Sequence, residues 1–598
     1  MRNTRNYMKL GKQLAAAALA GALLFLVGCQ AKPAMAVQTP QATAITSAAV
    51  ASRLPERGGE LSIAIPQGIT TYDPLLAQDE DLINMLSLIY ETPLTLGADG
   101  KFQPGLAETW TMDEAGTTFT FNIRQGVQFH NGNSLTAADI YQTILDVLAL
   151  DGTYAAGTNT GEGAAATQGA SQSEGQAPEA PSGFISGWTS GGGAAQSSAP
   201  PSSGQTTGNS GTQSANPGAS RYAAYNKEIA GVTLVDDSTI EIKMKKAGRD
   251  ALYFMTMPVR PKGADFKMPV GSGPYAVGSM DGAVQLGIND KWWKVAPYIT
   301  GITATPIDLK ETKLSLYQQG KLNFVTTDNL AAGKLKTTGK TQVVEYMTNY
   351  YDCLIPNLME GVLKNDQVRQ ALSFAINRRT LISTVMLNHA VATEMPVSPA
   401  FYAFNTKYNT YQIDQDMAKE LLAQQGYRTA PDGQGNVLSL SIIVPNEPSI
   451  MREEYRLDAA TQIAKQLEEV GVECTVEALD LAAYANRLKS GNFTLAYTSY
   501  YLDRNGDLSF MFNPDASGNY GHVASDELTA DIAACNAAVK EADVIAAYDR
   551  LEQYFMDKVP QIGLYYRTNS IVTDDAVAGM GSLYENQIFN DIAVWSMQ

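Results

Sequence analysis

The sequence predicts an α/β protein with more than one compact lobe. Segments with the two-residue period of a half-buried strand alternate along the chain with segments that repeat apolar residues every three or four positions, as amphipathic helices do. Such alternation is typical of α/β sheets. The chain has 598 residues, which is too many for one core and enough for two or three lobes, and its hydrophobic content of 44% can fill them.

The N-terminus has the composition of a secretion signal. Four basic side chains within the first twelve residues precede an apolar run from Leu14 to Val27. That run is shorter than the roughly 20 residues that a bilayer-spanning helix needs, so residues 1–28 are predicted to be a signal peptide. The run ends in Leu26-Val27-Gly28-Cys29, which resembles a bacterial lipobox and implies cleavage before Cys29 and acylation of that cysteine. The alternative is an uncleaved apolar anchor followed by an incidental cysteine.

Two further stretches have the composition of flexible chain. Residues 29–58 are rich in Ala, Thr, Ser, Gln and Pro, and a coil of about 28 residues spans roughly 30 Å on average, so we expect a tether there. Residues 152–220 consist largely of Gly, Ser, Ala, Gln, Thr and Pro and contain no Lys or Arg. Chain of this kind cannot bury enough apolar surface to offset its ordering entropy, which predicts a disordered insertion.

The most informative stretch runs from Pro104 to Ile140 and reads PGLAETWTMDEAGTTFTFNIRQGVQFHNGNSLTAADI. Its alternation predicts a strand at Phe119–Ile123 and a second short strand at Val127–Phe129. Asn131-Gly132 is a strong tight-turn dipeptide, and a hydroxyl side chain just beyond it can cap a helix that begins near Ala137. Locally this is a hairpin that leads into a helix, which specifies no function.

Taken as a block, these residues resemble the extracytoplasmic solute-binding proteins of ABC importers, family 5, which carry oligopeptides, dipeptides and nickel complexes. Three later segments match the family's motifs in the family's order. They are Pro269–Tyr275 (PVGSGPY), Asn289–Pro297 (NDKWWKVAP) and Asp366–Arg378 (DQVRQALSFAINR). The resemblance extends from about Glu60 to the C-terminus, apart from the insertion.

The resemblance implies an α/β, type II periplasmic-binding-protein-like fold with two lobes, an extra subdomain and an interlobe ligand cleft. It places residues 59–100, 268–352 and 560–598 in the core of lobe I. The extra subdomain of lobe I would then comprise residues 101–267, and lobe II residues 353–559.

The resemblance also assigns ligand-binding residues within Tyr497–Phe510 (YTSYYLDRNGDLSF). Peptide-binding members carry an aromatic residue, an Asp and a Phe at the positions that Tyr500, Asp503 and Phe510 occupy here. In those members the Asp pairs with the α-ammonium of the peptide, and a hydrogen bond to a charged group is worth about 1.5–3 kcal/mol. Asp507 is the substitute if the local spacing slips. The structural alternative for Asp503 is a loop carboxylate in an Asx-turn.

Paired aromatic residues are expected to form the walls of the cleft, because their rings supply contact area with few rotamers to freeze. Each candidate is also a plausible core residue. The candidates are Tyr350, Tyr351, Tyr500, Tyr501, Trp292 and Trp293. The chain departs from the family in having tyrosines where a tryptophan is usual near the Asp, so a peptide remains the favoured ligand but its identity is not specified. Trp110 and Phe129 are expected to be structural.

Composition and motifs argue against other classes. The formal net charge of −18 excludes nucleic acid as an expected partner, because phosphate binding needs clustered Lys and Arg. We expect no enzyme and no cofactor, since the chain contains no H-E-x-x-H, G-x-S-x-G or P-loop motif. The three histidines, His130, His389 and His522, are isolated in sequence, so no metal site is expected. Cys353, Cys474 and Cys535 lack C-x-x-C spacing and are expected to be isolated buried thiols.

These observations predict a lipid-anchored, monomeric substrate-binding subunit of an ABC importer on the extracytoplasmic face of a bacterial membrane. It would capture peptides by lobe closure and deliver them to the permease subunits. One alternative is a nickel or metal-chelate binder on the same scaffold, for which His522 would be the candidate ligand. The other is an anchored sensor or adhesin that has lost transport.

Overall fold

The computed structural model describes residues 56–150, 221–308, 312–338, 341–359, 361–408, 413–446, 454–574, 577–581 and 583–597. Residues from Pro55 onward form one compact unit. The predicted signal peptide, Cys29 and the predicted insertion lie outside the described residues, as does the predicted tether up to residue 55. None of the helices in the described ranges is both long and apolar enough to cross a membrane.

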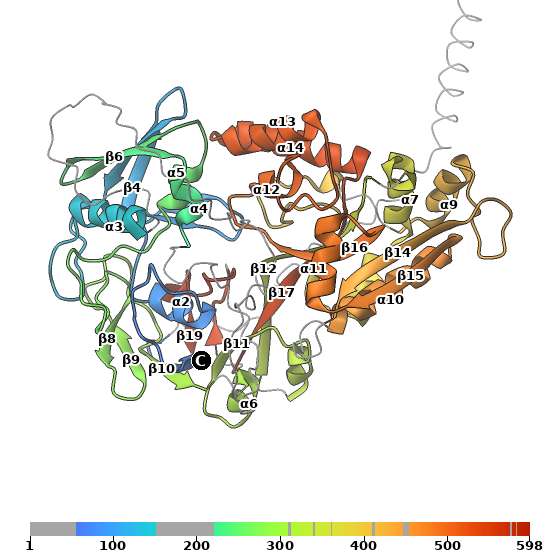
Figure 1. The fold of residues 1–598 in the computed structure, drawn as a ribbon. Helices are drawn as coiled ribbons and strands as arrows, with labels where there is room; N and C mark the ends of the chain where they lie inside the picture. The colour runs from blue at the N-terminus through green and yellow to red at the C-terminus, as the bar shows by residue number, and fades with distance from the viewer. Residues whose placement is uncertain are drawn as a thin grey trace, which may run out of the picture. The chain divides into compact units, whose positions relative to one another are not determined.

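A four-stranded sheet and helix α2 (Glu80–Ser87) form the core of the first lobe (Figure 1). The strands of this sheet, in spatial order, are β1 (Glu60–Pro66), β10 (Gly301–Ile307), β9 (Val284–Ile288) and β8 (Tyr275–Ser279). β1 runs parallel to β10, and the other neighbours are antiparallel. Trp595, near the C-terminus, packs into the same apolar cluster as Leu61 of β1. The end of the chain therefore returns to the sheet on which the compact unit began.

An antiparallel sheet forms the core of the segment predicted as the extra subdomain. Its strands, in spatial order, are β4 (Ala107–Met112), β5 (Thr118–Ile123), β7 (Thr239–Met244) and β6 (Ile229–Asp236). Alternate residues of β5 are buried, as its period predicted, and α3 (Ala137–Leu150) begins at the predicted residue. The strand predicted at Val127–Phe129 is wrong. That segment makes only one bridge, between Gln128 and Ser134, because the chain turns immediately afterwards.

A seven-stranded sheet joins the two lobes. Its path, in spatial order, is β11 (Phe324–Thr327), β17 (Ile562–Asp574), β12 (Thr341–Pro356), β16 (Leu495–Tyr501), β14 (Leu438–Pro445) and β15 (Val472–Leu479), and β13 (Ala390–Ala392) pairs with β17 beside it. The long strands β12 and β17 pass between the lobes. Tyr346 and Ile571 lie in the apolar cluster of β1, whereas Leu354 and Ile562 lie in the cluster of β14.

Helices cover both faces of this sheet in the second lobe. Because side chains alternate across a strand, Leu354 of β12 enters one core and its neighbours Cys353 and Ile355 enter another. The helices of the first core are α7 (Asp366–Ala375), α8 (Arg378–Thr384), α9 (Gln415–Gln424) and α10 (Glu454–Glu468). Those of the second core are α11 (Leu481–Ser490), α12 (Ser509–Phe512), α13 (Asp526–Ala537) and α14 (Glu541–Lys558).

The other elements are short and connect these layers. They are β2 (Leu94–Leu96), β3 (Phe102–Pro104), α4 (Ala223–Asn226), α5 (Asp250–Phe254), α6 (Lys313–Gln318), β18 (Val577–Ala578), β19 (Ser596–Met597) and four 3-10 turns, η1 (Ala332–Thr338), η2 (Val362–Lys364), η3 (Thr406–Tyr408) and η4 (Ile592–Val594). Two of them, α4 and α5, lie in the extra subdomain and matter for the site described below.

The Pro269–Tyr275 motif packs against the chain that follows α2. A Cβ on Gly271 would lie 2.0 Å from the carbonyl oxygen of Ile89, so this position accepts no side chain. His130, from the turn after β5, contacts the same motif: its Nδ1 accepts the Gly271 N–H at 3.3 Å and its Nε2 donates to the Gly273 carbonyl at 3.0 Å. These contacts explain physically why two distant motifs occur together.

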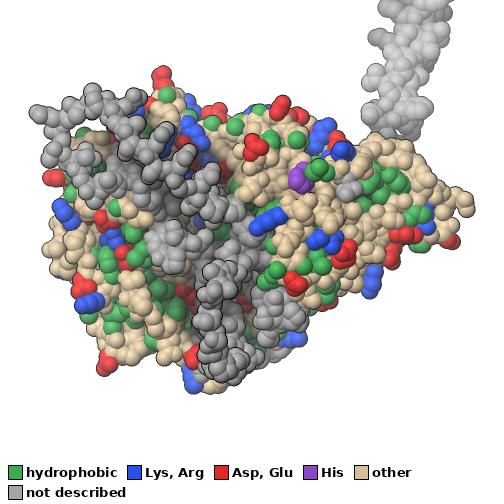
Figure 2. Space-filling model, in the orientation of Figure 1, with side chains coloured by type: hydrophobic (Ala, Val, Ile, Leu, Met, Phe, Trp, Pro, Cys, Tyr) green, Lys and Arg blue, Asp and Glu red, His purple; other side chains and the backbone are tan. Residues whose placement is uncertain are grey.

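The described surface carries charges of both signs, and the thiols lie where the sequence predicted. On the face shown in Figure 2, Lys and Arg side chains of the described residues are dispersed among acidic ones. Cys353, Cys474 and Cys535 are buried free thiols, as predicted.

Candidate functional site

A cavity lies where the loop after β16 meets both lobes. Asp503 and Arg504 of this loop line it, together with Asn349 of β12 and Tyr566 of β17. The other lining residues are Ala98, Gly100, Pro396, Val397, Ser398, Phe401, Leu502, Gly506, Tyr548 and Tyr584. Because these residues come from segments on both sides of the crossing strands, the cavity lies in the interlobe cleft.

Among the described residues, donors engage one oxygen of the Asp503 carboxylate. Its Oδ1 accepts the hydroxyl of Tyr225 at 2.7 Å and the backbone N–H of Arg504 at 2.8 Å. Within the described part of the chain, no donor reaches Oδ2. Burial raises the pKa of Asp503, and the hydrogen bond from Tyr225 opposes that rise. A cation in the cavity would stabilise the ionised form of this carboxylate, because it would offset the loss of contact with water on burial.

Arg504 connects the same loop to the opposite lobe. Its Nη1 donates to Oε1 of Gln587 at 2.8 Å, and its Nη2 donates to the carbonyl of Gly97. The guanidinium also lies 3.9 Å from the centre of the Tyr584 ring, which is a cation–π contact. The structure therefore shows the lobes in contact across the cleft.

A second cavity has Gln587, the hydrogen-bond partner of Arg504, in its wall. Arg504 lines the first cavity and Gln587 lines the second, so their hydrogen bond separates the two. The second cavity is walled mainly by α2, by the segment that follows it and by the C-terminal segment. Its polar and aromatic lining includes Ser87, Tyr90, Glu91, Thr92, Arg221, Trp292, Lys294, Asn586 and Asn590.

Glu91 in the second cavity is saturated with donors. Its carboxylate accepts the indole N–H groups of Trp292 and Trp293, each at 3.0 Å, and the hydroxyl of Ser272 at 3.0 Å. The ammonium of Lys294 lies 3.7 Å away. Burial raises the pKa of Glu91, and these partners oppose the rise. Of the two tryptophans expected in the cleft walls, Trp292 lines the cavity, whereas Trp293 packs against the core of the extra subdomain.

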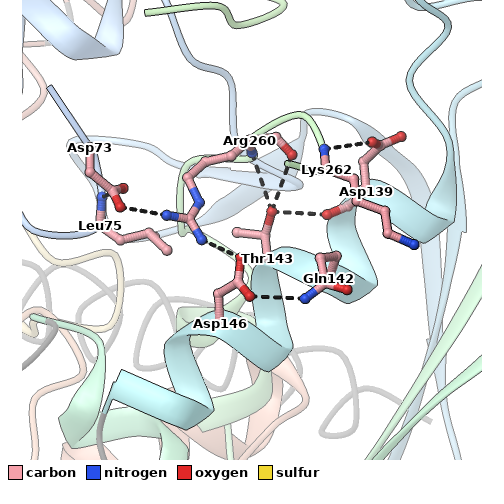
Figure 3. A network of polar contacts seen from close by, with 8 residues as sticks. All are labelled: Asp73, Leu75, Asp139, Gln142, Thr143, Asp146, Arg260 and Lys262. Carbon is pink, nitrogen blue, oxygen red and sulfur yellow. Dashed lines mark hydrogen bonds and ion pairs between the residues drawn. The ribbon is translucent and has the colours of Figure 1, made fainter. Parts of the chain in front are cut away.

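Arg260 joins the extra subdomain to the loop after β1 (Figure 3). Its Nη1 lies 2.5 Å from Oδ2 of Asp73, and its Nη2 pairs with Asp146 of α3. Its backbone N–H donates to the hydroxyl of Thr143 at 3.2 Å. The pKa of Asp73 is raised by burial and held down by Arg260. This network fixes the subdomain that carries α4 to the core of lobe I.

The predicted tyrosines lie on opposite faces of the interlobe sheet. The register of β12 with β16 pairs Tyr350 with Tyr501 and Tyr351 with Tyr500. Tyr350 and Tyr501 are half-buried, with ring centres 5.2 Å apart, and the Tyr501 hydroxyl accepts a hydrogen bond from Asn349 at 3.0 Å. Tyr351 and Tyr500 are 0% and 3% exposed and belong to the core beneath α11 and α14.

Phe510 and Asp507 lie beside the loop rather than in the cavities. The Phe510 ring packs edge-on against Tyr500, with centroids 6.0 Å apart. The Asp507 Oδ1 accepts the Ser509 N–H at 2.9 Å and the Asn536 amide at 2.7 Å. Of the seven predicted ligand residues, only Asp503 lines either cavity. The assignment of these seven residues as ligand contacts stays a prediction.

Several residues of the site were missed from the sequence. They are Asn349, Arg504 and Tyr584 in the first cavity, Glu91 and Gln587 in the second cavity and Tyr225 beside Asp503. The one signal available was the Arg504 side chain next to Asp503. The others are distant in sequence, and nothing in their local pattern distinguishes them from core or loop residues.

Comparison with known proteins identifies the family. Residues 101–522 match the model of the bacterial extracellular solute-binding proteins, family 5 (middle region). The chain belongs to this family. It is 22% identical over 438 residues to heme-binding protein A of Haemophilus influenzae, covering 69% of this chain and 68% of that protein. It is also 22% identical over 476 residues to the glutathione-binding protein GsiB of Salmonella typhimurium, covering 76% and 77%.

A solved structure supports the fold of this family 5 protein. The oligopeptide-binding protein AppA of Bacillus subtilis, in complex with a nonapeptide, superposes with a TM-score of 0.54 and 17% sequence identity. The match covers 91% of this chain and 100% of AppA. The predicted α/β, type II periplasmic-binding-protein-like fold is confirmed, and so is the family to which the sequence pointed.

Proposed function

We propose that this family 5 solute-binding protein is the substrate-binding subunit of an ABC importer for peptides, and that Asp503 accepts the peptide's α-ammonium. The observation that carries the proposal is the position of Asp503, which lines the interlobe cavity with Oδ2 unengaged by the described residues. A carboxylate desolvated in this way repels an anion and accepts a hydrogen bond from an enclosed ammonium. Hydrogen bonds to charged groups are worth about 1.5–3 kcal/mol.

The remainder of the cavity suits a peptide of unspecified side chains. Phe401, Tyr548, Tyr566 and Tyr584 line it. The three tyrosines are buried in this closed arrangement, and their rings would pack against side chains of many shapes once the lobes open. The nonapeptide complex of AppA and the glutathione specificity in the name of GsiB agree with a peptide ligand. The alternative is a non-peptide solute on the same scaffold, which the match to a heme-binding protein favours.

The test compares two neighbouring carboxylates with two probes. Trialanine carries a free α-ammonium, and N-acetyl-trialanine lacks it. We expect Asp503→Asn to weaken trialanine binding about tenfold or more, by removing a charge-assisted hydrogen bond, and to leave the acetylated peptide unchanged. Isothermal titration calorimetry measures both.

Asp507→Asn is the matched control, because Asp507 is four positions away and already bonded to Ser509 and Asn536. It should change neither affinity by more than about twofold. Equal losses for both peptides in Asp503→Asn would refute the amine clamp, and a selective loss in Asp507→Asn would transfer the role to that residue.

We further propose that Cys29 carries the lipid anchor and that the released chain tethers the protein beside the permease. The support is the lipobox at the end of the apolar run. Two or more acyl chains anchor a protein stably, whereas one does so only marginally. In a bacterial expression host, Cys29→Ser should abolish incorporation of labelled fatty acid and move the protein out of the membrane fraction. Retention of the label would contradict the assignment.

A further inference from the structure

Tyr225 reaches the proposed amine site from the extra subdomain. It lies in α4, is 7% exposed, and its hydroxyl donates to Oδ1 of Asp503 at 2.7 Å. The two residues are 278 positions apart, and Asp503 belongs to the loop of the second lobe. The bond therefore exists only while the extra subdomain lies against that loop.

The hydrogen bond from Tyr225 gives the two carboxylate oxygens of Asp503 different roles. Tyr225 and the N–H of Arg504 both donate to Oδ1. Two donors on one oxygen fix the rotation of the carboxylate, and within the described part of the chain Oδ2 receives none. In the closed cleft, a carboxylate held in this way presents one oriented acceptor to the cavity, and such orientation by the protein lowers the cost of holding the ligand there.

Packing holds the phenol of Tyr225 rigid. Its ring stacks on Tyr253 of α5 with centroids 5.6 Å apart, and Tyr253 packs edge-on against Phe102 at 4.8 Å. Tyr253 is 2% exposed, and its hydroxyl has no hydrogen-bond partner among the described residues. Of the stacked pair Tyr225 and Tyr253, only Tyr225 donates its hydroxyl to Asp503.

We propose that Tyr225 is a positioning residue of the amine site, which orients Asp503 from the opposite side of the cleft so that the site is complete only when the extra subdomain and the loop are in contact. This inference rests on the proposed peptide-binding function. Because the contact between Tyr225 and Asp503 forms only on closure, the closed cleft holds a peptide amine strongly and an open cleft holds it weakly.

The hydrogen bond also determines the pH range in which Asp503 is charged. Burial raises the pKa of Asp503 and donation from Tyr225 lowers it, because a hydrogen bond to the carboxylate favours the ionised form. The titratable and charged groups that face Asp503 are Tyr225, Tyr253, Arg221, Arg504, Tyr501 and Tyr584. Tyrosines and arginines keep their protons between about pH 4 and 8, so the carboxyl is the group of this cluster that titrates there.

The experiment compares Tyr225→Phe with Tyr253→Phe in the full chain. Both substitutions keep the ring and remove one hydroxyl. Trialanine binding is measured calorimetrically from about pH 4 to 8. Tyr225→Phe should weaken trialanine at pH 7 by about fivefold to tenfold, because Asp503 keeps its charge but loses the hydrogen bond that orients it, and should shift the acid limb of the binding profile to higher pH. Tyr253→Phe should bind within about twofold of the wild type with an unshifted profile.

Three results would overturn the inference. Tighter binding by Tyr225→Phe would mean that the phenol competes with the amine, and identical behaviour of the two variants would mean that it does not act on Asp503. In both cases selective loss of trialanine binding by Asp503→Asn would leave the proposed function standing. Failure of the wild type to bind trialanine would overturn both proposals. Unfolding midpoints of both variants show whether a loss of binding comes from misfolding.

Discussion

Glu91 and Asp503 are two partly buried carboxylates, each beside a cavity, with opposite surroundings. Glu91 receives two indole N–H groups and a hydroxyl, with an ammonium 3.7 Å away. Asp503 receives one phenol and the N–H of the next residue, both on the same oxygen. Burial raises the pKa of both carboxyl groups. Burial and a raised pKa therefore do not distinguish a structural carboxylate from one that is available to a ligand.

The number of donors makes the distinction between two carboxylates that both line a cavity. A buried acceptor whose lone pairs are all satisfied contributes to the architecture, and removing it leaves its donors unpaired at a cost of about 1–3 kcal/mol. A buried carboxylate with one unused oxygen can still accept a hydrogen bond from a ligand. In this protein the saturated carboxylate joins Trp292 and Trp293 to the chain after α2, and the unsaturated one faces the interlobe cleft.

The largest expected effect tests this difference directly through stability. Glu91→Gln should lower the free energy of unfolding by about 2 kcal/mol, because the neutral amide loses the charge that strengthens the hydrogen bonds from Trp292 and Trp293 and attracts Lys294, and only one of its two polar atoms can accept. Asp503→Asn should change it by less than about 0.5 kcal/mol, since the amide oxygen can still accept from Tyr225. Guanidinium unfolding followed by tryptophan fluorescence measures both. Equal destabilisation would show that counting donors does not separate the two sites.

A smaller effect concerns a third carboxyl group, Glu552 of α14, which is 0% exposed and lines neither cavity. Its Oε2 accepts the Asn405 N–H at 3.0 Å, whereas its Oε1 has no partner among the described residues. Burial raises its pKa to about 8, from 4.5. The folded protein thus holds a proton that the unfolded chain releases between these values, so stability falls as the pH rises through that window.

Glu552→Gln should remove this dependence and make the variant more stable than the wild type at pH 8, by on the order of 1–2 kcal/mol, with little difference near pH 4. Urea unfolding of both proteins at several pH values measures the slope. Trialanine affinity should stay within about twofold, because the cavity containing Asp503 is untouched. A wild-type stability that is flat or rises between pH 5 and 8 would contradict the assignment.

The periodicity of apolar residues was sufficient to predict individual strands and helices. The alternation of Phe119–Ile123 places its apolar residues in the core, and α3 begins at Ala137, because strand and helix periods depend on neighbours a few residues away. The same rules failed at Val127–Phe129, where a tight turn leaves room for one bridge only. The two close glycines of Pro269–Tyr275 were visible as a motif, although their reason, contact with the Ile89 carbonyl, was not.

By itself, the sequence determined the fold class, the family and the identity of Asp503 as the principal candidate, because these depend on short patterns that occur within one segment. Tertiary structure alone decided which tyrosines face the core, since the strand register pairs Tyr351 with Tyr500 on the buried face. It also decided that one oxygen of Asp503 is occupied by Tyr225, from 278 positions away. Contacts between distant segments depend on how the lobes pack, and no local pattern in the chain encodes them.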